Sequence, residues 1–81
     1  MTIEVFGTGC PECRQLAFAA KAAAERLGVP FDFCRVSNAE HILSRGIMDT
    51  PALAINGEVK AAGRVPNLEE IKQVILAAKA A

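Results

Sequence analysis

The chain has 81 residues, of which 52% are hydrophobic, so it is long enough for one small packed domain and too apolar for a disordered segment. Nine basic residues balance nine acidic ones, and Trp and Tyr do not occur, which argues against a nucleic-acid or anionic-membrane surface. No stretch predicts a membrane span or a signal peptide. We therefore expect a single domain over residues 1–81, monomeric and cytoplasmic, with no nucleic-acid or membrane partner.

The first half of the chain predicts two strands joined by a helix. Thr2–Phe6 alternates and is rich in β-branched residues, as is typical of a strand. Apolar side chains then recur every three or four residues from Cys10 to Leu27, which predicts a helix, and Gly28 suits its C-terminal cap. Phe31–Val36 predicts a second strand. Because a helix joins the two strands, they should run parallel.

A short helix is predicted next, over residues 38–45. Ser37 and Glu40 have the spacing of a capping box, so Ser37 is the expected N-cap, and Gly46 is expected to end the helix. His41, the single histidine, is expected to be a solvated residue of this helix rather than a ligand or a base.

The last third predicts a hairpin and a final helix. Ala52–Ile55 and Glu58–Ala62 are two strands joined by Asn56-Gly57, a strong hairpin signal. The final helix begins after Asn67 and should bury one apolar face, made of Leu68, Ile71, Ile75 and Ala78. The element order predicts an α/β fold, β-α-β-α-β-β-α, with a mixed four-stranded sheet and helices on both faces.

The candidate chemistry lies in the stretch Cys10-Pro11-Glu12-Cys13, between the first strand and the first helix. Pro11 suits the first position of a helix, which places Cys10 at its start and Cys13 one turn in. Only a thiolate attacks a disulfide, and the partial positive charge of a helix start stabilises an anion. Cys10 is therefore the expected nucleophile and Cys13 the resolving thiol of a redox couple.

Three other interpretations of the cysteines stay open. A structural bridge between Cys10 and Cys13 closes so short a loop that it would stabilise the fold by only about 2 kcal/mol. A soft-metal or metalloid-binding module would use Cys10 and Cys13, with or without Cys34 as a third ligand. A redox-inactive adaptor would use the fold alone to bind a partner. Cys34 itself stands among strand residues and is expected to be a buried, inert thiol.

The chain resembles the small thioredoxin-like and glutaredoxin-like redox-active disulfide proteins. The resemblance rests on Gly7–Cys13, on Thr50–Gly57 with its Thr-Pro and Asn-Gly pairs, and on Gly63–Pro66, in this order. It implies the minimal thioredoxin fold and a thiol–disulfide oxidoreductase that acts on protein disulfides. It also implies that the protein works without a bound cofactor or metal and is recycled by a reductase that the sequence does not identify.

The resemblance further implies where a substrate binds. Pro51 would be cis and lie against the dithiol, against the general preference for trans. Thr50 would offer its backbone to an extended client chain, and Thr8, Gly9 and Pro11 are the other expected substrate contacts.

The chain departs from its better-known relatives at three places. Gly9 and Glu12 stand where thioredoxin and many glutaredoxins, respectively, carry an aromatic residue. The turn 63–67 lacks the Gly-Gly pair and acidic residues with which glutaredoxins bind glutathione. The resemblance therefore does not extend to glutathione as a partner.

Overall fold

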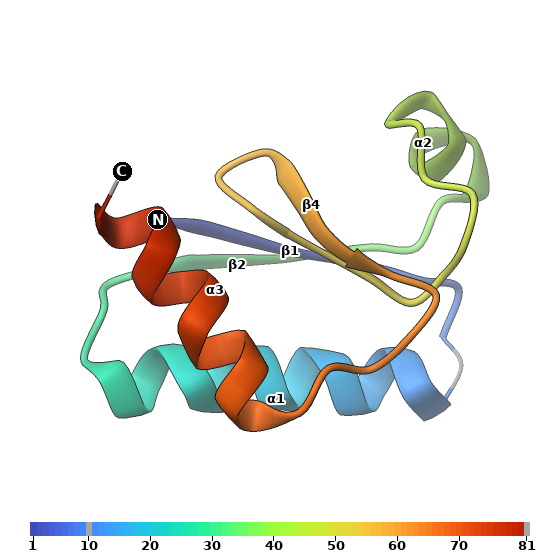
Figure 1. Cartoon of the computed structure of the whole chain (residues 1–81). Coiled ribbons are helices and arrows are strands. Elements are labelled where there is room, and N and C mark those ends of the chain that lie inside the picture. The colour runs from blue at the N-terminus through green and yellow to red at the C-terminus, as the bar shows by residue number, and fades with distance from the viewer. Residues whose placement is uncertain (10, 81) are drawn as a thin grey trace.

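The computed structural model describes residues 1–9 and 11–80 and contains the seven elements in the predicted order. Figure 1 shows a single layer of strands with helices packed on it. Among the described residues, no helix is long and apolar enough to cross a membrane. The elements are β1 (Thr2–Phe6), α1 (Pro11–Leu27), β2 (Asp32–Val36), α2 (Ala39–Ser44), β3 (Ala52–Ile55), β4 (Glu58–Ala62) and α3 (Leu68–Ala80).

The sheet has four strands in the order β2-β1-β3-β4 and is mixed, as expected. β1 and β2 run parallel, with Phe6 opposite Val36, whereas β3 is antiparallel to both β1 and β4. The turn between β3 and β4 has positive φ at both Asn56 (52°) and Gly57 (86°). This backbone is the one that an Asn-Gly hairpin favours, so the local sequence explains the turn.

Helices α1 and α3 cover one face of the sheet and enclose the main core (Figure 1). Ile71 and Ile75 of α3 are fully buried there, together with Ile3 of β1 and Leu53 of β3. The face of α1 that meets the sheet is largely alanine, and Ala20, Ala23 and Ala24 are completely buried. These small side chains let the helix lie close to the strands, because little volume separates the two backbones.

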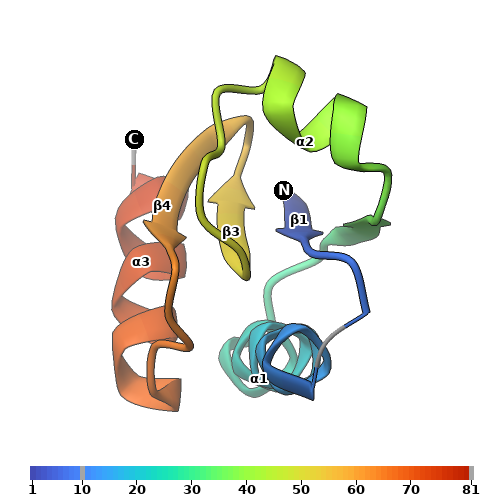
Figure 2. The ribbon, with the colours of Figure 1, turned by 90° about the vertical axis from the view of Figure 1, so that its right-hand side faces the viewer.

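Helix α2 lies on the opposite face of the sheet, which confirms that helices cover both faces (Figure 2). It contributes Ile42 to a second, smaller core, and the loop that follows contributes Ile47. The other members of this core are Phe6, Val36, Ala52 and Ala54, all at the same end of the sheet. Most of the second face therefore has no helix over it.

Two expected boundaries were wrong. Asn38 rather than Ser37 caps α2: its Oδ1 accepts a hydrogen bond from the His41 N–H at 3.0 Å, and the helix spans only Ala39–Ser44. Both residue types cap helices well, so the backbone path out of β2 decided between them. Strand β2 begins at Asp32, which is the first residue to pair with β1, rather than one residue earlier.

Candidate functional site

The described part of the CxxC stretch lies where β1 ends and α1 begins. Cys10, the expected nucleophile, lies outside the described residues. Cys13 is in the first turn of α1 and only 1% exposed, whereas Pro11 and Glu12 before it are exposed. Cys13, one of the two cysteines of the CxxC stretch, is therefore almost completely buried.

Gly7, which is buried just after β1, covers part of the Cys13 side chain. A Cβ atom on Gly7 would overlap Cys13 Sγ and approach Cys13 Cβ to 2.9 Å. The Gly7 N–H donates to the Val36 carbonyl at 2.9 Å, which extends the pairing of β1 with β2 by one residue. The motif predicted no role for Gly7 in making room for Cys13, because that contact depends on how α1 packs against the end of β1.

The Thr50–Pro51 pair precedes β3 and lies at the same end of the sheet as the CxxC stretch; we call this end the CxxC edge. The peptide bond between them is cis, as the family resemblance implied. Ala52 pairs with Phe6, so Pro51 and Gly7 are the next opposed positions beyond the paired strands. Pro51 is buried and Thr50 is exposed. Figure 1 likewise shows the loop after β1 and the segment before β3 at one end of the molecule.

The exposed residues of this edge include the remaining expected substrate contacts. Thr8 and Gly9 are exposed between β1 and α1, and Gly9 has a φ of 92°, which favours glycine. Thr8, Gly9 and Pro11 follow β1 directly, and Thr50 precedes Pro51, which lies opposite Gly7. Their contact with a substrate stays a prediction.

A third segment, the loop after β4, completes this edge. The Gly63 N–H donates to the Pro51 carbonyl at 2.9 Å, and Gly63 has a φ of 77°. A side chain there would also crowd Asp49, whose Cβ lies 3.1 Å from the position of a Gly63 Cβ. No local pattern predicts the contact between Gly63 and Pro51, because the pairing of β3 with β4 brings these two residues together.

Arg64, the next residue, is engaged by α3. Its guanidinium donates two hydrogen bonds to the Glu70 carboxylate in a bidentate pair. Hydrogen bonding to Arg64 lowers the pKa of the Glu70 carboxyl, and the same bond raises the pKa of the Arg64 guanidinium. The loop after β4 is thereby tied to the first turns of α3.

Cys34 is exposed, so the expectation of a buried thiol was wrong. β2 is an edge strand, and α2 covers only one end of its face of the sheet. Cys34 pairs with Glu4 and lies two residues before Val36 of the second core, so it faces the α2 side. Cys13 belongs to α1 on the other face.

This separation bears on the form of the metal-binding alternative in which Cys34 joins Cys10 and Cys13 as a third ligand. Cys34 and Cys13 lie on opposite faces of the sheet. Residues 1–9 and 11–80 contain no group of three or more His, Cys, Asp or Glu side chains arranged to hold a metal ion. Nothing in this part of the chain supports a three-cysteine metal site.

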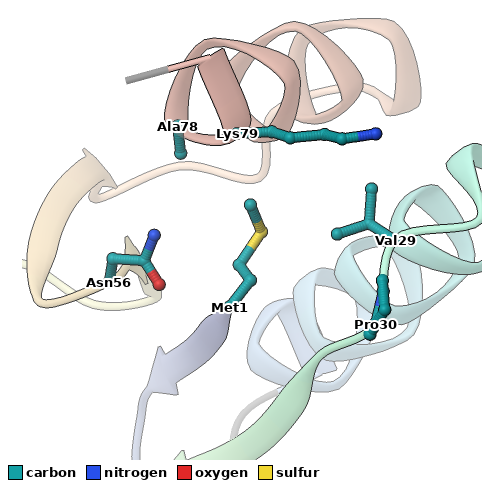
Figure 3. Close-up of a pocket in the computed structure, with 6 residues that line it drawn as sticks. All are labelled: Met1, Val29, Pro30, Asn56, Ala78 and Lys79. Atoms are coloured by element: carbon teal, nitrogen blue, oxygen red, sulfur yellow. The ribbon is translucent and has the colours of Figure 1, made fainter.

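A pocket of about 390 Å³ lies at the other end of the molecule. Its walls come from the start of β1, the end of α1 and the end of α3, and the Met1 side chain extends into it (Figure 3). The lining residues are Met1, Val29, Pro30, Asn56, Ala78 and Lys79. None of them belongs to the expected substrate contacts, so the pocket is separate from the CxxC edge.

Comparisons with known proteins agree with this arrangement. A family model described as a thioredoxin domain matches residues 1–76. A thioredoxin of Methanothermobacter thermautotrophicus is 39% identical over 75 residues, which cover 93% of this chain and 97% of the relative. A thioredoxin of Methanocaldococcus jannaschii is 34% identical over 73 residues, covering 90% of this chain and 84% of the relative. The chain therefore belongs to the thioredoxin domain family and is a thioredoxin-like redox protein.

Proposed function

We propose that this protein is a thiol–disulfide oxidoreductase that uses the Cys10/Cys13 couple on the disulfides of other proteins. The observation that carries the proposal is the position of Cys13, buried in the first turn of α1 beside Gly7, at the edge that also holds Thr50–Pro51. The relatives that match nearly the whole chain bear the name thioredoxin, which supports the same activity.

In the proposed reaction, the Cys10 thiolate attacks one sulfur of a client disulfide. The first client sulfur leaves as a thiolate, and Cys10 becomes joined to the client through a mixed disulfide. Cys13 then loses its proton and attacks Cys10, which releases the second client thiolate and forms the Cys10–Cys13 disulfide. The client gains two electrons, the protein loses two, and an external dithiol reductant restores the couple. The reverse sequence of steps oxidises a client dithiol.

The start of α1 supports the first step. Cys10 directly precedes Pro11, the first residue of a helix of 17 residues. The unpaired N–H groups and the dipole of a helix start stabilise a thiolate relative to its thiol, which lowers the pKa of a cysteine there. Cys13, by contrast, is covered by Gly7 and becomes reachable mainly for a sulfur already joined to Cys10.

The client would bind in extended form across the exposed residues of the edge. Thr50 would supply backbone groups to the client chain, while Pro51 beneath it is buried and held through its carbonyl by Gly63. Thr8, Gly9 and Pro11 would form the opposite side of the contact. We further propose that the protein acts as a monomeric single domain in the cytoplasm, without a bound cofactor, and is recycled by a reductase.

The proposal is tested by replacing each cysteine with serine. Dithiothreitol reduces insulin disulfides slowly by itself, and Cys10→Ser should abolish the acceleration of this reaction by the protein. Cys13→Ser should retain the first step and accumulate a mixed disulfide, detectable by mass spectrometry under non-reducing conditions. Cys34→Ser is the matched control and should keep full activity. If Cys10→Ser keeps full activity, Cys10 is not the nucleophile; if all three variants match the wild type, the redox proposal fails.

A second measurement places the couple among known redox proteins. The reduction potential of the Cys10–Cys13 pair can be measured in glutathione buffers and against a thioredoxin reductase system. A dithiol protein that reduces clients should lie near the reducing end of the range, about −270 mV, and an oxidising one near about −120 mV. A protein with no measurable potential in this interval would point instead to the redox-inactive adaptor.

A further inference from the structure

Arg45 makes a set of contacts that neither the proposed chemistry nor the sequence motifs account for. It follows the last residue of α2, and its side chain reaches back over the sheet. Its Nη1 and Nη2 donate to the two carboxylate oxygens of Glu4 at 3.1 and 3.3 Å, and Nη2 also lies 3.4 Å from the Gly57 carbonyl. Its guanidinium carbon is 5.1 Å from the centre of the Phe6 ring. One side chain thus joins α2 to β1 and to the β3–β4 turn.

The partners of Arg45 belong to the sheet, whereas Arg45 itself belongs to the connection between α2 and β3. Glu4 and Phe6 are on β1, which pairs with a strand on each side, and Phe6 is completely buried. The Glu4 and Arg45 side chains are 16% and 29% exposed, so the pair is largely shielded from water. A bidentate pair with this shielding fixes the direction of the guanidinium as well as its distance.

The segment 46–50 that follows Arg45 has few other attachments. Ile47 is 3% exposed, but Met48 is 81% exposed, and Asp49 and Thr50 are also exposed. Between the described residues, no backbone hydrogen bond is made by residues 48–50. The N–H groups of Gly46 and Ile47 donate to carbonyls of α2, so this end of the segment is fixed to the helix that Arg45 joins to the sheet. The other end is held by Pro51, whose carbonyl bonds to Gly63, and by Asp49, which packs beside Gly63.

We propose that Arg45 is a positioning residue that holds the segment 46–50 in place, and with it Thr50, which directly precedes Pro51 opposite Gly7. This inference rests on the proposed function, in which Thr50 offers its backbone to the client. Helix α2 has only six residues and buries only Ile42, so it supplies a weak anchor by itself. Without the contacts of Arg45, the segment would sample other positions, and a client would bind only to the fraction that has Thr50 in place.

The test separates client binding from thiol chemistry. Insulin serves as the protein disulfide and hydroxyethyl disulfide as a small neutral one, each with dithiothreitol as electron donor. Each rate is the acceleration by the protein, after subtraction of the rate with dithiothreitol alone. Arg45→Met should raise the KM for insulin about tenfold, which corresponds to Thr50 being in place in about a tenth of the molecules. The kcat for insulin and the rate with hydroxyethyl disulfide should not change. Arg45→Lys keeps the positive charge opposite Glu4 but cannot make the bidentate pair with it. Its KM for insulin should therefore lie between those of the wild type and Arg45→Met.

Amide hydrogen exchange supplies a measurement independent of activity. Exchange should become faster in Arg45→Met at Gly46 and Ile47, whose N–H groups donate to the Leu43 and Ile42 carbonyls. Exchange in β1 and β3 should stay as in the wild type. Lys72→Met is the matched control: it removes an ion pair with Glu69 on α3 through a side chain that is 22% exposed. This control should change neither the KM for insulin nor exchange at Gly46 and Ile47.

Three results would overturn the proposal. The first is an unchanged KM for insulin in folded Arg45→Met; the second is an equal loss of activity towards both disulfides; the third is unchanged exchange at Gly46 and Ile47. If Arg45→Met fails to fold, Arg45→Lys supplies the same comparisons. If the wild type reduces neither disulfide, the proposed function fails, and the exchange measurement alone then decides whether Arg45 holds the segment.

Discussion

Gly7 and Cys13 are packed so closely that no side chain fits on the glycine. A Cβ atom there would overlap the Cys13 sulfur and lie 2.9 Å from its Cβ. The contact joins the residue after β1 to the first turn of α1, and it contributes to the near-complete burial of Cys13. The close packing also holds the start of α1 against the end of β1, where the proposed nucleophile belongs.

Gly7→Ala should therefore destabilise the protein by about 1–3 kcal/mol, because the added methyl group must displace the Cys13 side chain or the start of α1. Urea unfolding followed by circular dichroism measures the change. Thr8→Ala is the control at the next, exposed position and should alter stability by less than about 0.5 kcal/mol. Equal free energies of unfolding for the two variants would contradict the prediction, because they would show that the backbone after β1 shifts to accommodate the methyl group without loss of stability.

The main core predicts a sharp contrast between neighbouring positions of α3. Ile75 is completely buried against the sheet, whereas Leu76 is 42% exposed. Ile75→Ala should lower the free energy of unfolding by about 2–5 kcal/mol, since it leaves a cavity in the core. Leu76→Ala should cost less than about 1 kcal/mol. A similar loss in both variants would mean that α3 packs with a different face.

The exposure of Cys34 predicts a reactive thiol outside the CxxC stretch. In the double variant Cys10→Ser, Cys13→Ser it is the remaining cysteine, so its reaction with iodoacetamide can be followed alone. The rate under native conditions should be similar to the rate in urea, because no protein atoms need to move to expose the sulfur. Strong protection in the native protein, relieved by urea, would instead support a buried Cys34.

The pair of Arg64 and Glu70 predicts a dependence of stability on pH. Arg64 lowers the pKa of Glu70 in the folded state, so the pair stabilises the fold above the unfolded pKa of Glu70. That contribution is lost as the pH falls through the lower, folded pKa. In Arg64→Gln, the pKa of Glu70 should rise, as measured by NMR titration of its carboxyl carbon, and the acid-dependent loss of stability should become smaller.

The control for this prediction is the second exposed pair of the same kind. Lys60 lowers the pKa of Glu58 through a hydrogen bond of 2.6 Å. Lys60→Gln should raise the pKa of Glu58 and leave that of Glu70 unchanged. An Arg64→Gln variant in which the pKa of Glu70 does not move would show that the pair is absent in solution.

The elements were predictable because their signals are local. The bounds of β1, β3 and β4 agree with the predictions from alternation and from the Asn-Gly turn, and α1 ends at Leu27, just before Gly28. The cap of α2 was misplaced by one residue because Ser37 and Asn38 are both suitable, and only the path of the chain leaving β2 distinguishes them. The exposure of Cys34 was missed because it depends on how far α2 extends over the sheet.

The sequence by itself determined the order of the elements, the CxxC stretch at the start of α1 and the family resemblance, since each rests on residues close together in the chain. Only the tertiary structure decided which distant residues share the site. The register of β1 with β3 sets Pro51 opposite Gly7, and the pairing of β3 with β4 brings Gly63 to Pro51. The packing of α2 on the sheet brings Arg45 to Glu4. These relationships depend on strand pairing and packing across the sheet, which no local pattern of residues specifies.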